Sequence, residues 1–259
     1  MTNQDIETRI NEEFDAMQSP AAWNAHSKRQ LQPVLGQLDY SKSEKFAEYL
    51  NERFMDAAMA NNAVEMNIKW GTLSRGDKIA FAQKITNTLI ELLYGDIRSN
   101  RIKTYNTNSG EEYTPTDEFF DAIYKDDIKQ YIDTQVKINV TESNSGLMSL
   151  SHNKKLNINL DWPLYADMTN FLMDLRHELM HMVDIFIPQI STLSPKTRKT
   201  SMRYYISGRN GDDFEYYQNN PLEINANLKR REFRTLCYAR LAAATIEYAR
   251  AKALTRTRA

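Results

Sequence analysis

Apolar residues recur every three or four positions over much of the first hundred residues, which is the spacing of an amphipathic helix. In residues 41–60 the repeating apolar positions are Phe46, Leu50, Phe54 and Ala58. A second such pattern begins after Ser74, a favourable helix N-cap, and ends at Gly95. A stretch rich in turn-forming residues follows it, and a further helix is expected over residues 116–133. The sequence therefore predicts a helical N-terminal region.

Between residues 136 and 160 the pattern changes to an alternation of apolar and polar residues. The alternating apolar residues are Val136, Ile138 and Val140, and then Leu156, Ile158 and Leu160. A period of two is typical of β-strands, and the segment Leu147–Leu150 is a candidate for another strand. We expect a small antiparallel sheet here. The predicted fold class is α+β, mainly α-helical.

The helical period returns directly after this sheet. Over residues 165–186, before Pro188, one stripe holds Leu172, Leu175, Leu179, Met182 and Phe186. Residues 189–220 have no clear period, and so long an irregular loop is unusual unless it is a lid, a binding loop or disordered. A final long helix is expected from about Pro221 to near the C-terminus. We predict a helical N-terminal region over residues 1–110 and a second domain over 111–259.

The composition is that of an ordinary globular protein. Apolar residues make up 41% of the chain and charged residues 26%, and the net charge is -1. This balance favours neither nucleic acid nor a membrane surface as a partner. One cysteine excludes a disulfide framework and a cysteine-rich zinc module. The polar, acidic start and the lack of a long apolar run indicate a cytoplasmic protein, with signal-independent export left open.

The segment "MDLRHELMHMVD" carries the clearest chemical signal. His177 and His181 are two of only four histidines in the chain. Four residues apart on a helix, their side chains stack on one face, roughly opposite the apolar stripe, and can grip one Zn²⁺. Glu178 lies just off that face, where it could accept a proton from a zinc-activated water. The alternative is a buried helix with two hydrogen-bonded histidines.

With this motif, "HELMH", the sequence resembles the zincin metallopeptidases, over roughly residues 135–235. The resemblance implies a zincin-like core in which a small sheet precedes the motif helix, and zinc-dependent hydrolysis of peptide bonds. It also implies that an edge strand around "GLMSLSHNKKLNINL" aligns an extended peptide by strand addition. The metzincin branch is excluded, because no glycine and third histidine follow the motif. The remaining resemblance is to the gluzincins or aspzincins, in which the third ligand is a carboxylate.

A catalytic zinc site takes three protein ligands and leaves one position open. No histidine follows His181, and His26 and His152 are interpreted as surface residues. Gluzincins take the third ligand from a glutamate on a later helix, which implies Glu223 in "NPLEINAN". Asn220 and Glu223 also have capping-box spacing, so a purely capping role stays open. The fallback ligands are Asp212, Asp213 and Glu215.

Further residues are candidates for supporting roles. Asp184 lies too far along the helix from His177, about 10 Å, for both to bind a tetrahedral metal, so it is a candidate partner for a histidine N–H. A solvated Asp184 is an equal alternative. Asn227 has the place where many gluzincins have an aspartate that orients a histidine. A tyrosine would stabilise the oxyanion, and the sequence does not choose among Tyr204, Tyr205, Tyr216 and Tyr217.

The expected function is that of a zinc metallopeptidase acting on a protein or peptide. The rival is a non-enzymatic structural or interaction protein that keeps a zinc site or a vestige of one. Its working surface would be the basic C-terminal helix, because the residues from Lys229 onward include nine basic side chains and two acidic ones. A nucleic-acid-binding protein is a third interpretation, which the balanced overall charge disfavours. The sequence specifies neither the cleavage specificity nor the oligomeric state.

Overall fold

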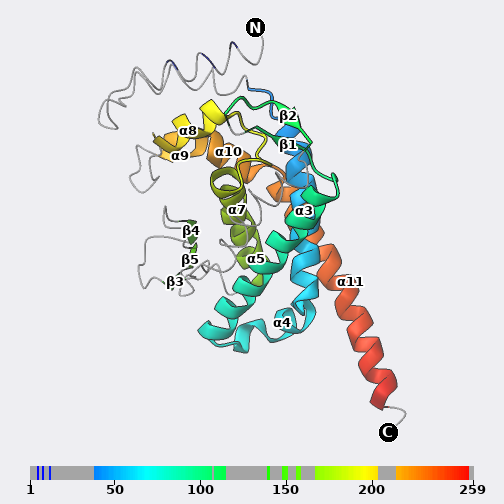
Figure 1. Ribbon diagram of the computed structural model, residues 1–259. Helices are drawn as coiled ribbons and strands as arrows, with labels where there is room; N and C mark the ends of the chain where they lie inside the picture. The colour runs from blue at the N-terminus through cyan, green and yellow to red at the C-terminus, as the bar shows by residue number, and fades with distance from the viewer. Residues whose placement is uncertain are drawn as a thin grey trace. The chain divides into compact units, whose positions relative to one another are not determined.

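Helices dominate the computed structural model of the protein (Figure 1). The structure describes residues 5, 8, 12, 38–106, 108–114, 139–140, 148–150, 156–158, 167–203 and 214–256. The predicted class, mainly α-helical α+β, is confirmed for this part of the chain. The helix expected over residues 116–133 lies outside the described residues. Within them, no helix is both long and apolar enough to cross a membrane.

The two predicted N-terminal helices are present as α3 (Ser41–Ala60) and α5 (Arg75–Arg98). Ser74 caps α5 through a capping box with Asp77, as its sequence position predicts. Gly95 does not end the helix, which continues for three residues. Ile97 is fully buried, and burying one more apolar residue favours continuing the helix beyond the glycine. Between these helices lie α4 (Ala63–Lys69) and the short 3-10 helix η2 (Trp70–Thr72), which the pattern did not predict.

The predicted sheet has three short strands: β3 (Asn139–Val140), β4 (Met148–Leu150) and β5 (Leu156–Ile158). Their order is β3-β5-β4. β4 pairs with β5 antiparallel, as expected, but β3 pairs with β5 in parallel, so the prediction of a wholly antiparallel sheet is wrong. The reason is that side chains alternate in the same way in both kinds of pairing. An alternating sequence therefore does not reveal strand direction.

A second, two-stranded sheet was missed. β1 (Thr104–Tyr105) and β2 (Glu112–Tyr113) pair antiparallel within the stretch that the turn-forming residues marked as a loop. Gly110, in the connection between them, has a φ of 75°, a conformation that glycine adopts without steric strain. Strands of two residues are too short to produce a periodic pattern.

The motif helix is α7 (Met168–Phe186). Four residues of its predicted apolar stripe, Leu172, Leu175, Leu179 and Met182, are buried. The segment after it was predicted to be one irregular loop, which is wrong, because it contains α8 (Pro195–Arg203) and α9 (Phe214–Asn219). Ser194 caps α8 by accepting a hydrogen bond from the Thr197 N–H at 3.1 Å. These helices are short and polar, so few apolar positions record their period.

The final helix is not continuous, contrary to the prediction. It consists of α10 (Pro221–Asn227) and α11 (Arg230–Arg256). The break lies at Lys229, whose φ of 56° is left-handed. Contacts at this residue offset the strain: its carbonyl accepts a hydrogen bond from the Asn51 amide at 3.2 Å, and its ammonium pairs with Glu48 at 3.0 Å.

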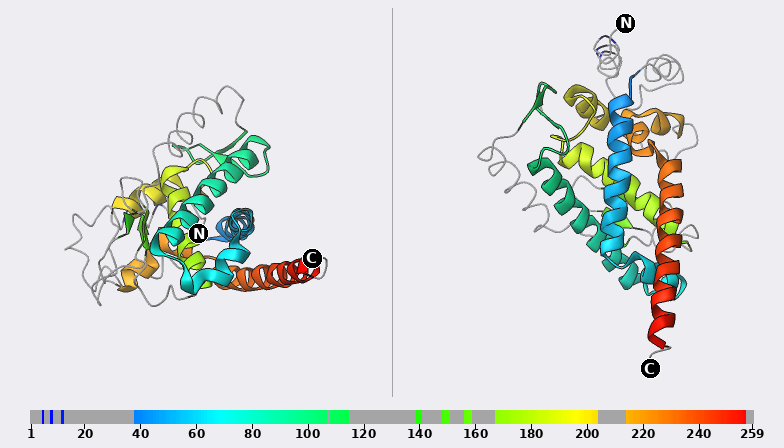
Figure 2. Two further views of the ribbon diagram at one scale, coloured as in Figure 1. Left: turned by 90° about the horizontal axis from the view of Figure 1, so that it is seen from below. Right: turned by 90° about the vertical axis from the view of Figure 1, so that its right-hand side faces the viewer.

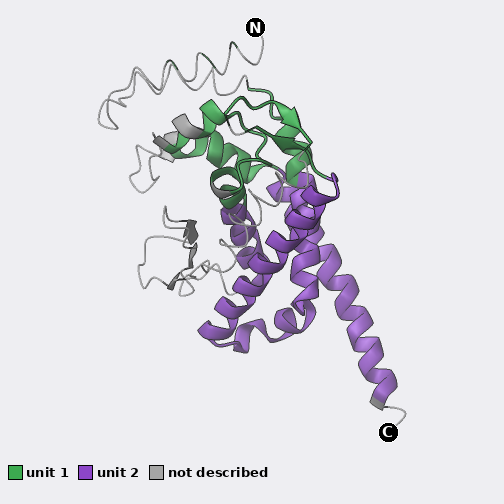
Figure 3. Ribbon diagram, viewed as in Figure 1, with its two compact units in different colours: residues 1–47, 102–115, 180–228 green, residues 48–101, 116–179, 229–259 purple. Residues whose placement is uncertain are grey.

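The chain forms two compact units, each assembled from separate segments (Figure 3). Unit 1 contains residues 1–47, 102–115 and 180–228, and unit 2 contains residues 48–101, 116–179 and 229–259. The division passes through α3 and α7, each of which is one unbroken helix. The division into a helical N-terminal region over 1–110 and a second domain over 111–259 stays a prediction.

In unit 2, α11 runs along α3 (Figure 2). Phe54 of α3 and Phe233 of α11 are fully buried and meet edge to face, with ring centroids 5.3 Å apart. Further along, Arg240 donates two hydrogen bonds to Asp56 Oδ1, both at 2.9 Å. The second half of α11 is largely exposed, with Ile246 54% accessible. These contacts therefore lie in the first half of α11.

Replacing Phe233 with alanine is expected to lower the free energy of unfolding by about 3–5 kcal/mol, because it removes a fully buried aromatic ring and leaves a cavity. Ile246→Ala, on the exposed half of the same helix, is the matched control and should change stability by about 0.5 kcal/mol or less. Urea denaturation monitored by circular dichroism measures both. Equal losses for the two variants would contradict the assignment of this core.

Candidate metal centre

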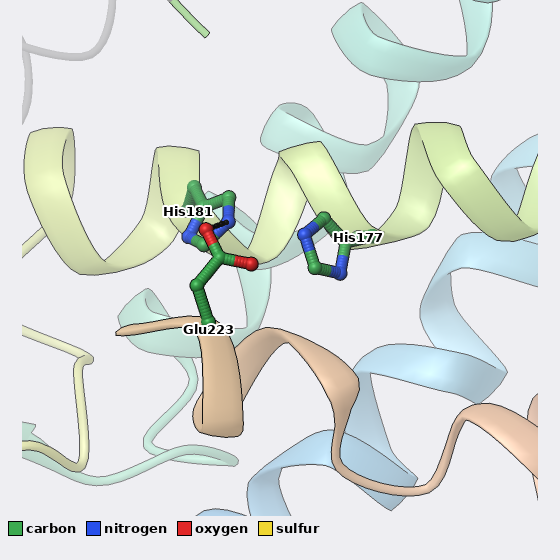
Figure 4. Close-up of side chains that lie close together, drawn as sticks. All are labelled: His177, His181 and Glu223. Carbon is green, nitrogen blue, oxygen red and sulfur yellow. Dashed lines mark ion pairs between the residues drawn. The ribbon is translucent and has the colours of Figure 1, made fainter. Parts of the chain in front are cut away.

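Helix α7 positions the two motif histidines. His177 and His181 are one turn apart on it, and each is only 7% exposed (Figure 4). Because the helix is unbroken between them, both imidazoles project from the same face. The helix face that carries the two histidines is buried, as the apolar stripe is. Two polar residues on this amphipathic helix therefore do not mark a solvated face.

Glu223 comes from the first turn of α10 and is fully buried. Asn220 caps this helix, its side chain accepting a hydrogen bond from the Leu222 N–H at 2.9 Å, and Pro221 takes the first helical position. The Glu223 carboxylate points toward α7, and its Oε1 lies 3.1 Å from His181 Nε2 (Figure 4). The Glu223 carboxylate therefore contacts a histidine. The capping-box spacing in the sequence did not decide between this role and a capping role.

His177, His181 and Glu223 together form a cluster with the composition of a metal site. One ligand atom from each lies within 4.8 Å of the others. Ligands bound tetrahedrally to Zn²⁺ at 2.0–2.1 Å are about 3.3 Å apart. The separation of 3.1 Å between His181 Nε2 and Glu223 Oε1 already meets this requirement. Two imidazoles and one carboxylate are also a donor set that zinc accepts, with the fourth position left for water.

Burial gives an electrostatic reason for a cation at this place. A carboxylate removed from water, as Glu223 is, needs compensating positive charge or strong hydrogen bonds. A neutral imidazole offers a hydrogen bond, whereas a divalent cation held by the three residues would offer charge as well. The buried donor set therefore fits Zn²⁺.

Glu178 follows His177 on α7 and is 8% exposed. It is not among the three clustered residues. One residue along an α-helix turns the side chain by about 100°, so Glu178 projects to one side of the histidine face. This is the position expected for an acid or base that acts beside a metal rather than binding it.

Asp184 is the centre of a hydrogen-bond network within unit 1. It is 1% exposed, so the interpretation as a solvated residue is wrong. Its Oδ1 accepts a hydrogen bond from Ser191 Oγ at 2.5 Å and its Oδ2 from Asn225 Nδ2 at 2.7 Å, so neither bond is the predicted one from a histidine N–H. Burial raises the pKa of Asp184, while these two bonds and the charges of His181 and Arg198 act in the opposite direction.

Arg198, on α8, supports the same region. Its guanidinium is largely buried and donates to the carbonyls of Pro188 and Leu193, at 3.0 and 3.2 Å. Burial lowers the pKa of Arg198, and the charge of Asp184 opposes that shift. Asn220 also donates to the carbonyl of Ser201 at 3.2 Å, which joins α8 to the start of α10. Part of the segment 189–220 thus packs beside the helix that carries Glu223.

The sequence missed Asn225 and favoured Asn227. Asn227 is exposed, and its amide donates to the carbonyl of Glu223 in its own helix at 2.9 Å. Asn225, buried and two residues after Glu223, instead reaches Asp184 of α7. No spacing rule marks Asn225, because its contact depends on how α10 packs against α7.

Of the remaining candidates, the structure places only Tyr217 with its side chain. His26, His152, Asp212, Asp213, Tyr204 and Tyr205 lie outside the described residues, as do the side chains of Glu215 and Tyr216. Tyr217 is half-buried on α9. The choice of an oxyanion-stabilising residue therefore stays open among the four tyrosines.

Comparison with known proteins adds no family to this description. No family model, curated protein or solved structure matches the chain. The resemblance to zincins therefore stays a prediction from the sequence motif.

If Glu223 is one of three protein ligands, changing it to alanine is expected to weaken Zn²⁺ binding by at least about tenfold. Glu232→Ala, which removes an exposed glutamate of α11, is the control and should bind Zn²⁺ like the unmodified protein. Competition with a chromophoric chelator gives both affinities, and circular dichroism checks that α-helix content persists. An unchanged affinity for Glu223→Ala would transfer the role to Asp212, Asp213 or Glu215.

Proposed function

We propose that the protein is a zinc-dependent metallopeptidase with a gluzincin-like site. The observation that carries this proposal is the buried cluster of His177, His181 and Glu223. Glu178 directly follows His177 in the sequence. In this proposal His177, His181 and Glu223 bind the metal, and Glu178 is the general base. The cofactor is Zn²⁺.

A bound Zn²⁺ would polarise the carbonyl of the substrate and lower the pKa of a water molecule to about 7. The protein's own contribution is to hold the ligands and to move protons. A carboxylate oxygen of Glu178 accepts the proton of the attacking water. Glu178 then passes that proton to the leaving amine. Its buried position keeps bulk water from competing for that proton. One carboxylate therefore acts first as base and then as acid.

A peptide substrate suits the sheet that precedes α7 in the chain. Among the described strands, β4 lies at one edge of the order β3-β5-β4 and is antiparallel to β5. An edge strand offers free backbone N–H and C=O groups that can pair with an extended peptide. We assign β4 the role of aligning the substrate backbone. This pairing would recognise the backbone of the peptide and not its side chains.

The rival function is a non-enzymatic protein that keeps the zinc site for its structure. Its interaction surface would be the exposed, basic second half of α11, with Arg250 and Lys252 as two of its charges. Zinc binding is common to both functions. Proteolysis that depends on Glu178 belongs only to the first, so a catalytic assay separates them.

The purified protein is expected to bind about one Zn²⁺ per chain, and His177→Ala or His181→Ala should abolish that binding, because a catalytic site takes only three protein ligands. His152→Ala is the control, since this histidine is not assigned to the site. Inductively coupled plasma mass spectrometry after dialysis measures the stoichiometry. Full zinc content in both His177→Ala and His181→Ala would refute the proposed site.

Replacing Glu178 with glutamine should leave zinc content and fold unchanged and reduce peptide hydrolysis by about 100-fold or more, because an amide cannot accept the proton. The exposed Glu247, changed in the same way, provides the control. A mixture of fluorogenic peptides, with and without chelator, is the assay. Chelator-sensitive cleavage at an unchanged rate by Glu178→Gln would rule this residue out as the base.

A further inference from the structure

Two polar side chains of α10 contact residues of α7. Glu223 lies 3.1 Å from His181 Nε2, and Asn225 donates a hydrogen bond of 2.7 Å to Asp184 Oδ2. His181 and Asp184 are three residues apart and share one face of α7. Both residues of α10 are fully buried, and all four belong to unit 1. The same pair of helices is thus joined at the candidate metal site and again one turn beyond it.

Stability alone does not explain a buried asparagine at this position. Within the described residues, Asn225 Oδ1 is buried without a hydrogen-bond partner, which is unfavourable. An apolar side chain of similar size would avoid this desolvation and fill the same space. What the amide provides and an apolar residue cannot is the directed bond to Asp184.

Asp184 is itself held firmly enough to act as an anchor. Ser191 Oγ donates to its other carboxylate oxygen at 2.5 Å, and the same hydroxyl lies 3.3 Å from the Leu193 N–H. Helix α10, by contrast, has only seven residues. A helix so short has little intrinsic stability, so its position depends on its caps and on its contacts with other elements.

We propose that Asn225 and Asp184 are positioning residues whose hydrogen bond fixes α10 against α7 and thereby sets the place of the Glu223 carboxylate beside His181. This inference rests on the proposed metal site. Asn225 touches neither metal nor substrate in it. The pair acts through Glu223, because a rotation or shift of a one-to-two-turn helix would carry the carboxylate out of reach of a metal held by the histidines.

Titration with Co²⁺, whose visible absorption reports coordination geometry, tests the proposal on the full-length protein. Asn225→Leu removes the bond, and Asn227→Leu is the matched control on the exposed side of the same helix. Asp184→Asn is the conservative variant, since its amide can still accept from Ser191 and donate to a flipped Asn225 side chain. Circular dichroism establishes that each variant is folded.

The expected result is that Asn225→Leu weakens Co²⁺ binding by about 10–100-fold and changes the absorption spectrum, while Asn227→Leu and Asp184→Asn match the unmodified protein. A folded Asn225→Leu with unchanged affinity and spectrum would overturn the proposal, and so would an equal loss in folded Asp184→Asn. If Asn225→Leu does not fold, Asn225→Ala replaces it with the same expectations. Failure of both to fold would overturn the positioning role in favour of a structural one.

Absence of Co²⁺ binding by the unmodified protein would be a different result. It would remove the metal site itself, and with it the proposed function. Normal binding by the unmodified protein together with normal binding by Asn225→Leu would remove only the positioning role. The two failures are therefore distinguishable in one series of titrations.

Discussion

The burial of the Glu223 carboxylate against His181 is the interaction on which the rest of this site depends. A fully buried carboxylate is tolerated only where charge or hydrogen bonds compensate it. Here it is brought to α7 by a short helix with its own asparagine cap and proline start. The local sequence "NNPLEINAN" therefore encodes both a helix start and, within its first turn, a residue that faces the histidines. Without that contact, α7 would carry two buried histidines and no third residue that could complete a metal site.

The same helix pair shows how polar groups can be placed in a dry interior. His181 and Asp184 on α7 meet Glu223 and Asn225 on α10, so polar residues face polar residues across one seam. Ser191 and Arg198 hold the loop that follows α7 through Asp184 and the carbonyls of Pro188 and Leu193. Such a network fixes the orientation of its side chains more than it adds to the free energy of unfolding. The reason is that each hydrogen bond in it replaces a hydrogen bond to water in the unfolded chain.

Sequence reasoning predicted the parts of this arrangement that are local. The amphipathic patterns gave α3, α5 and α7, and the spacing of His177 and His181 put both on one helix face. Glu223 was selected through family resemblance and the helix-start signals at Asn220 and Pro221, and the structure brings it to the histidines. The parallel pairing of β3, the break at Lys229 and the contact of Asn225 with Asp184 were not predictable. Each depends on tertiary packing, which leaves no periodic trace in the sequence.

Whether His177, His181 and Glu223 hold one zinc ion is tested most directly by anomalous diffraction at the zinc absorption edge. The account predicts a single strong peak about 2.0–2.1 Å from a ring nitrogen of His177 and of His181, and about 2.0–2.2 Å from a carboxylate oxygen of Glu223. In crystals grown with zinc, a peak elsewhere on the chain, or no peak among these residues, would contradict it.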